Sequence, residues 1–116
     1  MHLLFVLTLE PNVEYCNFLQ SLVKEALSRG HKIDALYLTK SAVALASPHF
    51  ALGSEQKQLQ DKLYRLSIEG EFPILVCGKA YRACGLPPSN LGKGMMLSGY
   101  TELAKCIVEA DKVVEL

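Results

Sequence analysis

Residues 72–85 read FPILVCGKAYRACG. Three apolar residues at 74–76 precede Cys77, and Gly78 begins a more polar run whose composition is compatible with a helix. A short apolar run of this kind is typical of a strand that is buried on both faces. Cys77 is therefore expected at the carboxyl end of a strand, where open α/β sheets place their ligand sites.

Strand-like and helix-like segments alternate along the rest of the 116-residue chain. Apolar runs predict further strands at 3–9, 32–38, 94–98 and 112–116, and helical spacing predicts helices at 13–29, from 54 onward and at 99–111. Segment 41–54 is expected to be a loop with a short helical turn, because Pro48 and Gly53 interrupt it. The alternation predicts one α/β domain over 1–116, with a mostly parallel five-stranded sheet and helices on both faces.

Two of the expected helices have a clear apolar face. In the helix from 54 onward this face is formed by Leu59, Leu63 and Leu66. In the last helix it is formed by Leu103, Ala104, Ile107 and Val108. Apolar residues at this spacing indicate the side of a helix that packs on the core.

Composition and charge exclude several classes of protein. Twelve Lys and Arg residues balance twelve Asp and Glu residues, so no positive field favours direct binding of nucleic acid. The apolar N-terminal run lacks a basic leader and a small-residue cleavage site, and it is shorter than the about 18 residues of a membrane span. We therefore expect a cytoplasmic protein without a membrane segment, whose four cysteines are free thiols.

The sequence contains no recognisable cofactor motif. The cysteines form no C-x-x-C and no paired Cys/His pattern, and the three histidines have no triad or metal spacing. Neither G-x-G-x-x-G nor G-x-x-x-x-G-K-[ST] occurs. We therefore expect no metal site and no nucleotide cofactor.

Cys77 is the strongest candidate for chemistry. Gly78 allows the chain to turn, the amides of a following helical turn can point at the sulfur, and Lys79 and Arg82 can add positive charge. These groups favour the thiolate, the nucleophilic form of cysteine, and a reactive sulfur is also expected to be open to solvent at the rim of the sheet. The alternative is a small buried apolar residue at a strand end, a common role for cysteine.

Cys84 and His49 are weaker candidates. Cys84 follows seven residues after Cys77, which is about 10 Å along a continuous helix, whereas a disulfide needs Cα atoms within about 7 Å. Cys84 is expected to end a short helix beside Gly85, with a resolving role as the alternative. His49 follows the second strand on the same edge of the sheet, either as a solvated loop residue or as a neighbour of the thiol.

Three features together resemble the DsrE/TusD group of sulfur-relay proteins. They are the strand that ends in Cys77, Gly85 eight residues later, and the C-terminal run SNLGKGMMLSGYTELAKCIVEADKVVEL at 89–116. The resemblance implies a flavodoxin-like sheet and a sulfur carrier in which Cys77 accepts a sulfane sulfur as a persulfide and passes it to a partner's cysteine. It also implies a role in tRNA wobble-uridine thiolation or in oxidative sulfur metabolism, and a homo- or hetero-oligomer of related subunits.

The chain departs from the family pattern just after Cys77. Relatives commonly carry an alanine-rich stretch that ends in two basic residues, whereas here Ala83 and Cys84 take those places and the basic residues are Lys79 and Arg82. This departure leaves the electrostatics of the site, and its partner, open.

Three functions remain as alternatives. The first is a sulfurtransferase with Cys77 as carrier, which needs sulfur-donor and sulfur-acceptor proteins as partners but no cofactor. The second is a non-catalytic scaffold subunit of a sulfur-relay complex, and the third is a dithiol oxidoreductase that uses Cys77 with Cys84. The uncharged segment 41–54 is expected either to contact another subunit or to pack on its own sheet.

Overall fold

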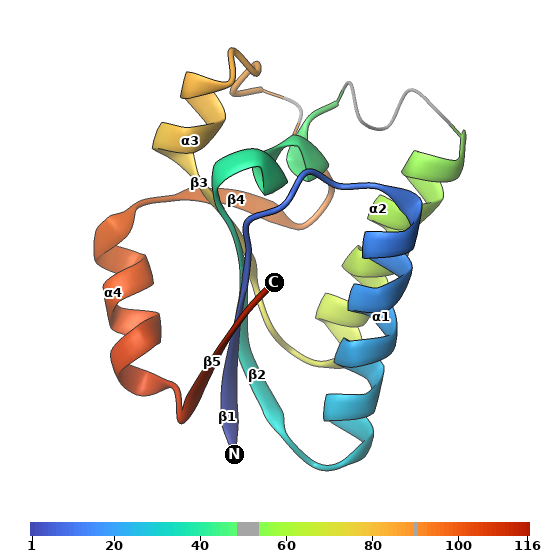
Figure 1. The fold of residues 1–116 in the computed structure, drawn as a ribbon, viewed down its shortest axis with the longest axis vertical. Coiled ribbons are helices and arrows are strands. Elements are labelled where there is room, and N and C mark those ends of the chain that lie inside the picture. Colours follow the sequence, from blue (N-terminus) through green and yellow to red (C-terminus); the bar gives the residue numbers. More distant parts are fainter. Residues whose placement is uncertain (49–53, 90) are drawn as a thin grey trace.

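The fold is a parallel β-sheet with helices on both faces (Figure 1). The structure, a computed structural model, describes residues 1–48, 54–89 and 91–116. Its strands are β1 (His2–Leu7), β2 (Lys32–Leu38), β3 (Ile74–Cys77), β4 (Met95–Ser98) and β5 (Lys112–Glu115). They lie in the order β4-β3-β2-β1-β5, and every neighbouring pair is parallel. The predicted five-stranded parallel sheet is confirmed.

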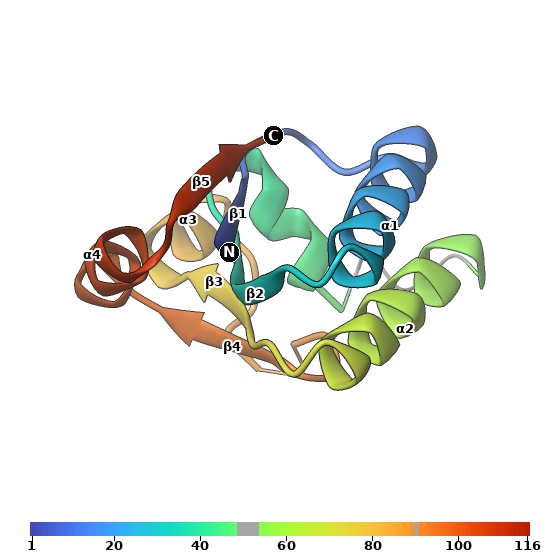
Figure 2. The same ribbon diagram turned by 90° about the horizontal axis from the view of Figure 1, so that it is seen from below.

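Helices cover the two faces of this sheet. They are α1 (Val13–Ser28), the 3-10 helix η1 (Lys40–Ala46), α2 (Ser54–Glu69), α3 (Gly78–Ala83) and α4 (Tyr100–Glu109). The helices α1 and α2 lie side by side on one face, and α4 lies on the other (Figures 1 and 2). This arrangement confirms the predicted α/β fold class. Flavodoxin has the same layers but a different strand order, 2-1-3-4-5. The likeness to flavodoxin is therefore in the layers and the parallel sheet, and not in the order of the strands.

Local sequence signals set the two ends of α1. The side chain of Asn12 accepts a hydrogen bond from the amide of Tyr15 at 2.9 Å and so caps the first turn. Gly30 follows the last turn with a φ of +81°, a left-handed conformation that glycine adopts without strain. The amide of His31 then donates to the carbonyl of Ala26 at 3.1 Å, which closes the helix where the glycine predicts.

The core surrounds β3 and its neighbours. Leu36 and Leu38 of β2 and Ile74 and Val76 of β3 are 0% exposed. From α2, the expected stripe Leu59, Leu63 and Leu66 is buried as predicted. Full burial of one such side chain stabilises the fold by about 1.5–3 kcal/mol. All four residues of β3 are buried, so the strand that ends in the candidate thiol is held by packing on both faces.

Part of the segment expected to be a loop with a short helical turn is a buried helix. Residues 40–46 form η1, in which Ala42, Val43, Leu45 and Ala46 are buried. This helix packs against β3 and α3, so the expected helical turn is found at 40–46. The apolar residues of η1 therefore pack within their own chain. Residues 49–53 of the segment lie outside the described residues.

The side of α4 that packs on the sheet is not the apolar face read from the sequence. Leu103 and Cys106 are half-buried against the core, together with Ala110 just after the helix. Ile107 is 46% exposed and Val108 is 84% exposed, so of the expected apolar face only Leu103 packs on the core. Because the side chains of Cys106 and Ala110 are small, α4 can pack closely on the sheet with this side. The larger side chains of Ile107 and Val108 then point outward.

Candidate functional site

Cys77 is the last residue of β3 and the N-cap residue of α3. In register it lies opposite Ser98 of β4, while Leu75, two residues earlier, lies opposite Tyr37 of β2. Because side chains alternate along a strand, Tyr37, Cys77 and Ser98 project from the same face of the sheet. Three neighbouring strands therefore bring a thiol and two hydroxyls together near their carboxyl ends.

The phenol of Tyr37 lies beside the thiol. Tyr37 is 0% exposed, and its hydroxyl donates to the carbonyl of Gly99 at 3.2 Å. Burial, the thiol of Cys77 and the phenol of Tyr100 together raise the pKa of Tyr37 to about 12, against a small opposing effect of Ser98. The phenol therefore stays protonated, and remains a hydrogen-bond donor, at neutral pH.

The hydroxyl of Ser98 is the second polar group at this place. Its oxygen is buried and makes no hydrogen bond of ordinary geometry with any described residue. It lies close enough to the hydroxyl of Tyr37 to lower the pKa of that phenol. The site thus holds a second hydroxyl in register with Cys77.

Both basic residues of α3 lie near its first turn. A Cβ atom placed on Gly78 would lie 3.3 Å from Nη1 of Arg82 and 3.3 Å from the carbonyl oxygen of Ser98. The guanidinium of Arg82 is therefore folded back over the start of the helix. The Nζ atom of Lys79 lies 6.0 Å from the ring centroid of Tyr100, whose side chain is exposed. Positive charge and the free amides of the first turn thus gather at the end of α3 that follows the thiol.

Cys77 is buried, contrary to the expectation of a sulfur open to solvent. The residue is 1% exposed. Tyr37 and Tyr81, both 0% exposed, belong to the same core, and α3 follows directly on the end of the strand. A second protein can reach the sulfur only if α3 or the neighbouring side chains move.

The whole chain matches the model of one known protein family. The model of the DsrE/DsrF-like family matches residues 1–116. The chain belongs to the DsrE/DsrF-like family. It is similar to the sulfurtransferase TusD of Cronobacter sakazakii, with 28% identity over 79% of this chain and 80% of that protein. It is also similar to a sulfurtransferase TusD homolog of Pasteurella multocida, with 26% identity over 80% of this chain and 81% of that protein.

Solved structures share the fold of this DsrE/DsrF-like chain. The ychN protein from E. coli matches 100% of this chain and 99% of its own with a TM-score of 0.79 at 20% identity. MTH1491, a protein of unknown function from Methanobacterium thermoautotrophicum, matches 99% of this chain and 98% of its own with a TM-score of 0.76 at 15% identity. At these identities the likeness concerns the fold alone.

Cys84 stands apart from the thiol in this DsrE/DsrF-like site. It is the exposed C-cap residue of α3, and its amide donates to the carbonyl of Ala80 at 3.1 Å. Gly85 follows with a φ of +71°, as expected for the end of a short helix. At about 1.5 Å per residue, the helix separates the cysteines by about 10 Å, more than the about 7 Å that a disulfide spans. A bond between Cys77 and Cys84 would require α3 to unwind.

The remaining cysteines are packing residues. Cys16 is 0% exposed, and desolvation raises its pKa to about 11. Burial, followed by the carboxylates of Glu102 and Glu109, raises the pKa of Cys106. Both thiols are protonated at neutral pH and are poor nucleophiles.

His49, the remaining candidate, lies outside the described residues. Within 1–48, 54–89 and 91–116, no three His, Cys, Asp or Glu side chains come together as ligands for a metal ion. The same part of the chain contains no helix that is both long and apolar enough to cross a membrane.

The sequence did not single out Tyr37 and Ser98, which lie beside the thiol. The signal for both was present. Tyr37 is the second-last residue of β2 and Ser98 is the last residue of β4. Since parallel strands end at the same edge of a sheet, aligning the ends of the predicted strands places both beside Cys77.

Proposed function

We propose that the protein is a cytoplasmic sulfurtransferase that carries a sulfane sulfur on Cys77 as a persulfide. The observation that supports this most strongly is the thiol at the end of β3 with the protonated phenol of Tyr37 against it. The two curated relatives are named a sulfurtransferase and a sulfurtransferase homolog. The relay would serve tRNA wobble-uridine thiolation or oxidative sulfur metabolism.

The transfer needs no external oxidant or reductant. The thiolate of Cys77 attacks the outer sulfur of a persulfide on the donor protein, forming one S–S bond while the donor's S–S bond breaks. The donor leaves as a thiolate, and Cys77 carries the added sulfur. A thiolate of the acceptor protein then attacks this outer sulfur in the same way and releases Cys77.

Several groups would stabilise the ionised sulfur. The hydroxyl of Tyr37 can turn its proton from the carbonyl of Gly99 to the sulfur, because hydroxyl hydrogens rotate. The amides that begin α3 and the guanidinium of Arg82 supply positive potential. The buried hydroxyl of Ser98 can bond to the sulfur that is added.

Access to the sulfur is the step that a partner would control. With Cys77 only 1% exposed, attack by a second protein requires the short helix α3 to shift. The helix is only six residues long, and the exposed residues Cys84 and Gly85 follow it. We propose that docking of the donor or acceptor moves α3, so that the persulfide is shielded from other thiols between transfers.

Related subunits are the other partners that we propose. The outer side of α4 exposes Ile107 and Val108, and the edge strands β4 and β5 expose Met96 and Val113. We call these four residues the partner surface. Exposed apolar residues of this size favour contact with another protein, in a homo- or hetero-oligomer.

The test of the carrier function is to load the purified chain with glutathione persulfide, alkylate it, digest it and weigh the cysteine peptides. The peptide with Cys77 should carry one extra sulfur atom, in the wild type and in the variant Cys84→Ser. The variant Cys77→Ser should carry none. Extra sulfur on the exposed Cys84 alone would contradict the proposal.

A scaffold subunit is the second candidate, and the burial of Cys77 is the observation that favours it. In that case partner subunits hold the active thiol, and Cys77 only fills the core. A chromosomal Cys77→Ser substitution would then leave thiolation or sulfur oxidation in the cell unchanged. The carrier function instead requires that this substitution abolish the pathway.

A further inference from the structure

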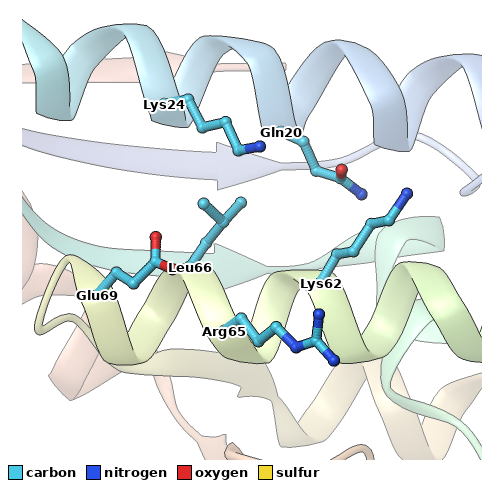
Figure 3. A pocket seen from close by; sticks show the side chains of 6 residues that line it. All are labelled: Gln20, Lys24, Lys62, Arg65, Leu66 and Glu69. Carbon is cyan, nitrogen blue, oxygen red and sulfur yellow. The ribbon is translucent and has the colours of Figure 1, made fainter.

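A groove lies between α1 and α2 (Figure 3). Figure 1 shows these two helices on the face of the sheet opposite α4. Its volume is about 300 Å³. Its walls are formed by Gln20, Lys24, Lys62, Arg65, Leu66 and Glu69. The sulfur chemistry proposed above uses none of these residues.

The groove carries uncompensated positive charge. Three cations, Lys24, Lys62 and Arg65, face one carboxylate, Glu69, which leaves a net charge of +2. None of the three cations forms an ion pair with a described residue. Arg65 and Glu69 have the i,i+4 spacing that allows a pair, yet Figure 3 shows Arg65 extending along α2 away from Glu69. The ammonium groups of Lys24 and Lys62 lie between the two helices, and neither is paired with a carboxylate among the described residues.

Gln20 adds a donor with no acceptor. Its side chain is only 9% exposed, and its Nε2 atom is buried without a hydrogen-bond partner among the described residues. Figure 3 shows this amide nitrogen turned into the groove, toward the ammonium group of Lys62. An amide N–H₂ group and an ammonium group can only donate, so neither satisfies the other. Both are satisfied at once by an oxygen-rich anion between them.

We propose that this groove binds a small tetrahedral oxyanion of charge −2, either phosphate or a sulfur oxyanion. Such an anion offers several oxygens, so it can accept hydrogen bonds from Gln20, Lys62 and Arg65 together. A volume of about 300 Å³ is at the lower limit of small-molecule sites, which matches a small ion better than a nucleotide. Glu69 at one end of the groove repels an extended acidic peptide.

The ion would also reduce the repulsion between the cations that α1 and α2 contribute to the groove. Lys24 comes from α1, while Lys62 and Arg65 come from α2. A ligand that binds only the folded chain stabilises it in proportion to the logarithm of its concentration. Phosphate or thiosulfate should therefore raise the midpoint of thermal unfolding more than potassium chloride does at equal ionic strength.

The direct test is a titration of the ¹⁵N-labelled chain followed by NMR. Potassium phosphate and potassium thiosulfate are added separately, each against potassium chloride at the same ionic strength. We expect a saturable shift of the Gln20 side-chain amide signal, with a dissociation constant below about 10 mM. Tighter binding of one anion than of the other identifies the natural ligand as a phosphate or as a sulfur oxyanion.

Substitutions test the assigned contacts. Arg65→Gln and Lys62→Gln should each weaken binding by about tenfold, as expected for one charge-assisted hydrogen bond. Gln20→Met, which keeps the side-chain volume but removes the donor, should also weaken it. Lys57→Gln is the matched control, because Lys57 is exposed on α2 and does not line the groove. Cys77→Ser should bind as the wild type does, since the groove is independent of the thiol.

Two results would overturn the proposal. One is the absence of any saturable shift up to about 50 mM anion, a concentration at which a site with a dissociation constant of 10 mM would be mostly filled. The other is equal weakening by Lys57→Gln and Arg65→Gln, which would indicate a diffuse effect of charge without a defined site.

Discussion

The phenol of Tyr37 lies against the thiol of Cys77 near the carboxyl end of the sheet, and neither residue is open to solvent. The two come from neighbouring parallel strands, so their spacing is set by the backbone hydrogen bonds between β2 and β3. Burial and the thiol hold the pKa of Tyr37 at about 12, which keeps its proton in place. The arrangement places a protonated hydroxyl beside the sulfur.

Replacing Tyr37 by phenylalanine should slow persulfide loading of Cys77 by about tenfold, because one hydrogen bond to a charged group contributes about 1.5 kcal/mol. The initial rate is followed by mass spectrometry of the quenched protein. Tyr15→Phe is the matched control, since the hydroxyl of Tyr15 also donates to a backbone carbonyl, that of Leu116, at 3.2 Å. Equal rates for the two variants would show that Tyr37 has no part in loading.

Arg82→Gln should slow loading about two- to fivefold at low salt, because it removes a charge that is folded back over the start of α3. The difference from the wild type should shrink as the ionic strength rises, since about 1 M salt screens charges beyond about 3 Å. Lys105→Gln, at an exposed position on α4, is the control. A difference that does not depend on salt would indicate a structural defect and not an electrostatic role.

The free energy of unfolding should fall as the pH rises from about 9 to about 11. Burial raises the pKa of Cys16 from 9.0 to about 11, so in this interval the unfolded chain loses a proton that the folded chain keeps. The stabilisation is complete below pH 9, and about 2 kcal/mol is lost by pH 11.

Urea unfolding at pH 8 and at pH 10.5 measures this loss. Cys16→Ala should be less stable at both values, because it leaves a cavity, but its stability should depend less on pH. Cys84→Ala should keep the pH dependence of the wild type, because Cys84 is exposed. The same dependence in Cys16→Ala as in the wild type would rule out Cys16 as the titrating group.

Ile107→Lys should break the assembly of the chain with itself or with a related subunit, because it places a charge in the partner surface. Size-exclusion chromatography with light scattering measures the assembly. Ile68→Lys is the matched control, since Ile68 is 61% exposed but lies on α2, on the opposite side of the sheet. An assembly that survives Ile107→Lys and dissociates in Ile68→Lys would move the interface to the other face.

The sequence predicted that Cys77 lies at the carboxyl end of a strand, because the apolar run at 74–76 is typical of a buried strand. It left open whether the thiol is exposed or buried, because burial depends on contacts with residues such as Tyr37, which is distant from Cys77 in the chain. The packing of residues 41–46 was left open for a related reason. The sequence indicates a loop with a short helical turn before Pro48, but only the fold shows that Ala42, Val43, Leu45 and Ala46 lie in the core.

The helical pattern of α4 shows a different limit. Residues 103, 104, 107 and 108 and residues 103, 106 and 110 both recur at helical spacing, and hydropathy favours the first set. The structure uses the second set, because small side chains at 106 and 110 allow a close approach to the sheet. Most of the set that hydropathy favours is exposed instead. This exposure is expected if these residues contact the partner that we propose.

The most direct test of the sulfur carrier is the intact mass of the four single Cys→Ser variants after exposure to a persulfide donor and then to an acceptor thiol. If Cys77 is the carrier, the variants at Cys16, Cys84 and Cys106 each gain one sulfur atom and lose it again to the acceptor, while Cys77→Ser gains none. If Cys77→Ser gains and releases sulfur as the others do, the carrier is not Cys77 and the proposed function is wrong.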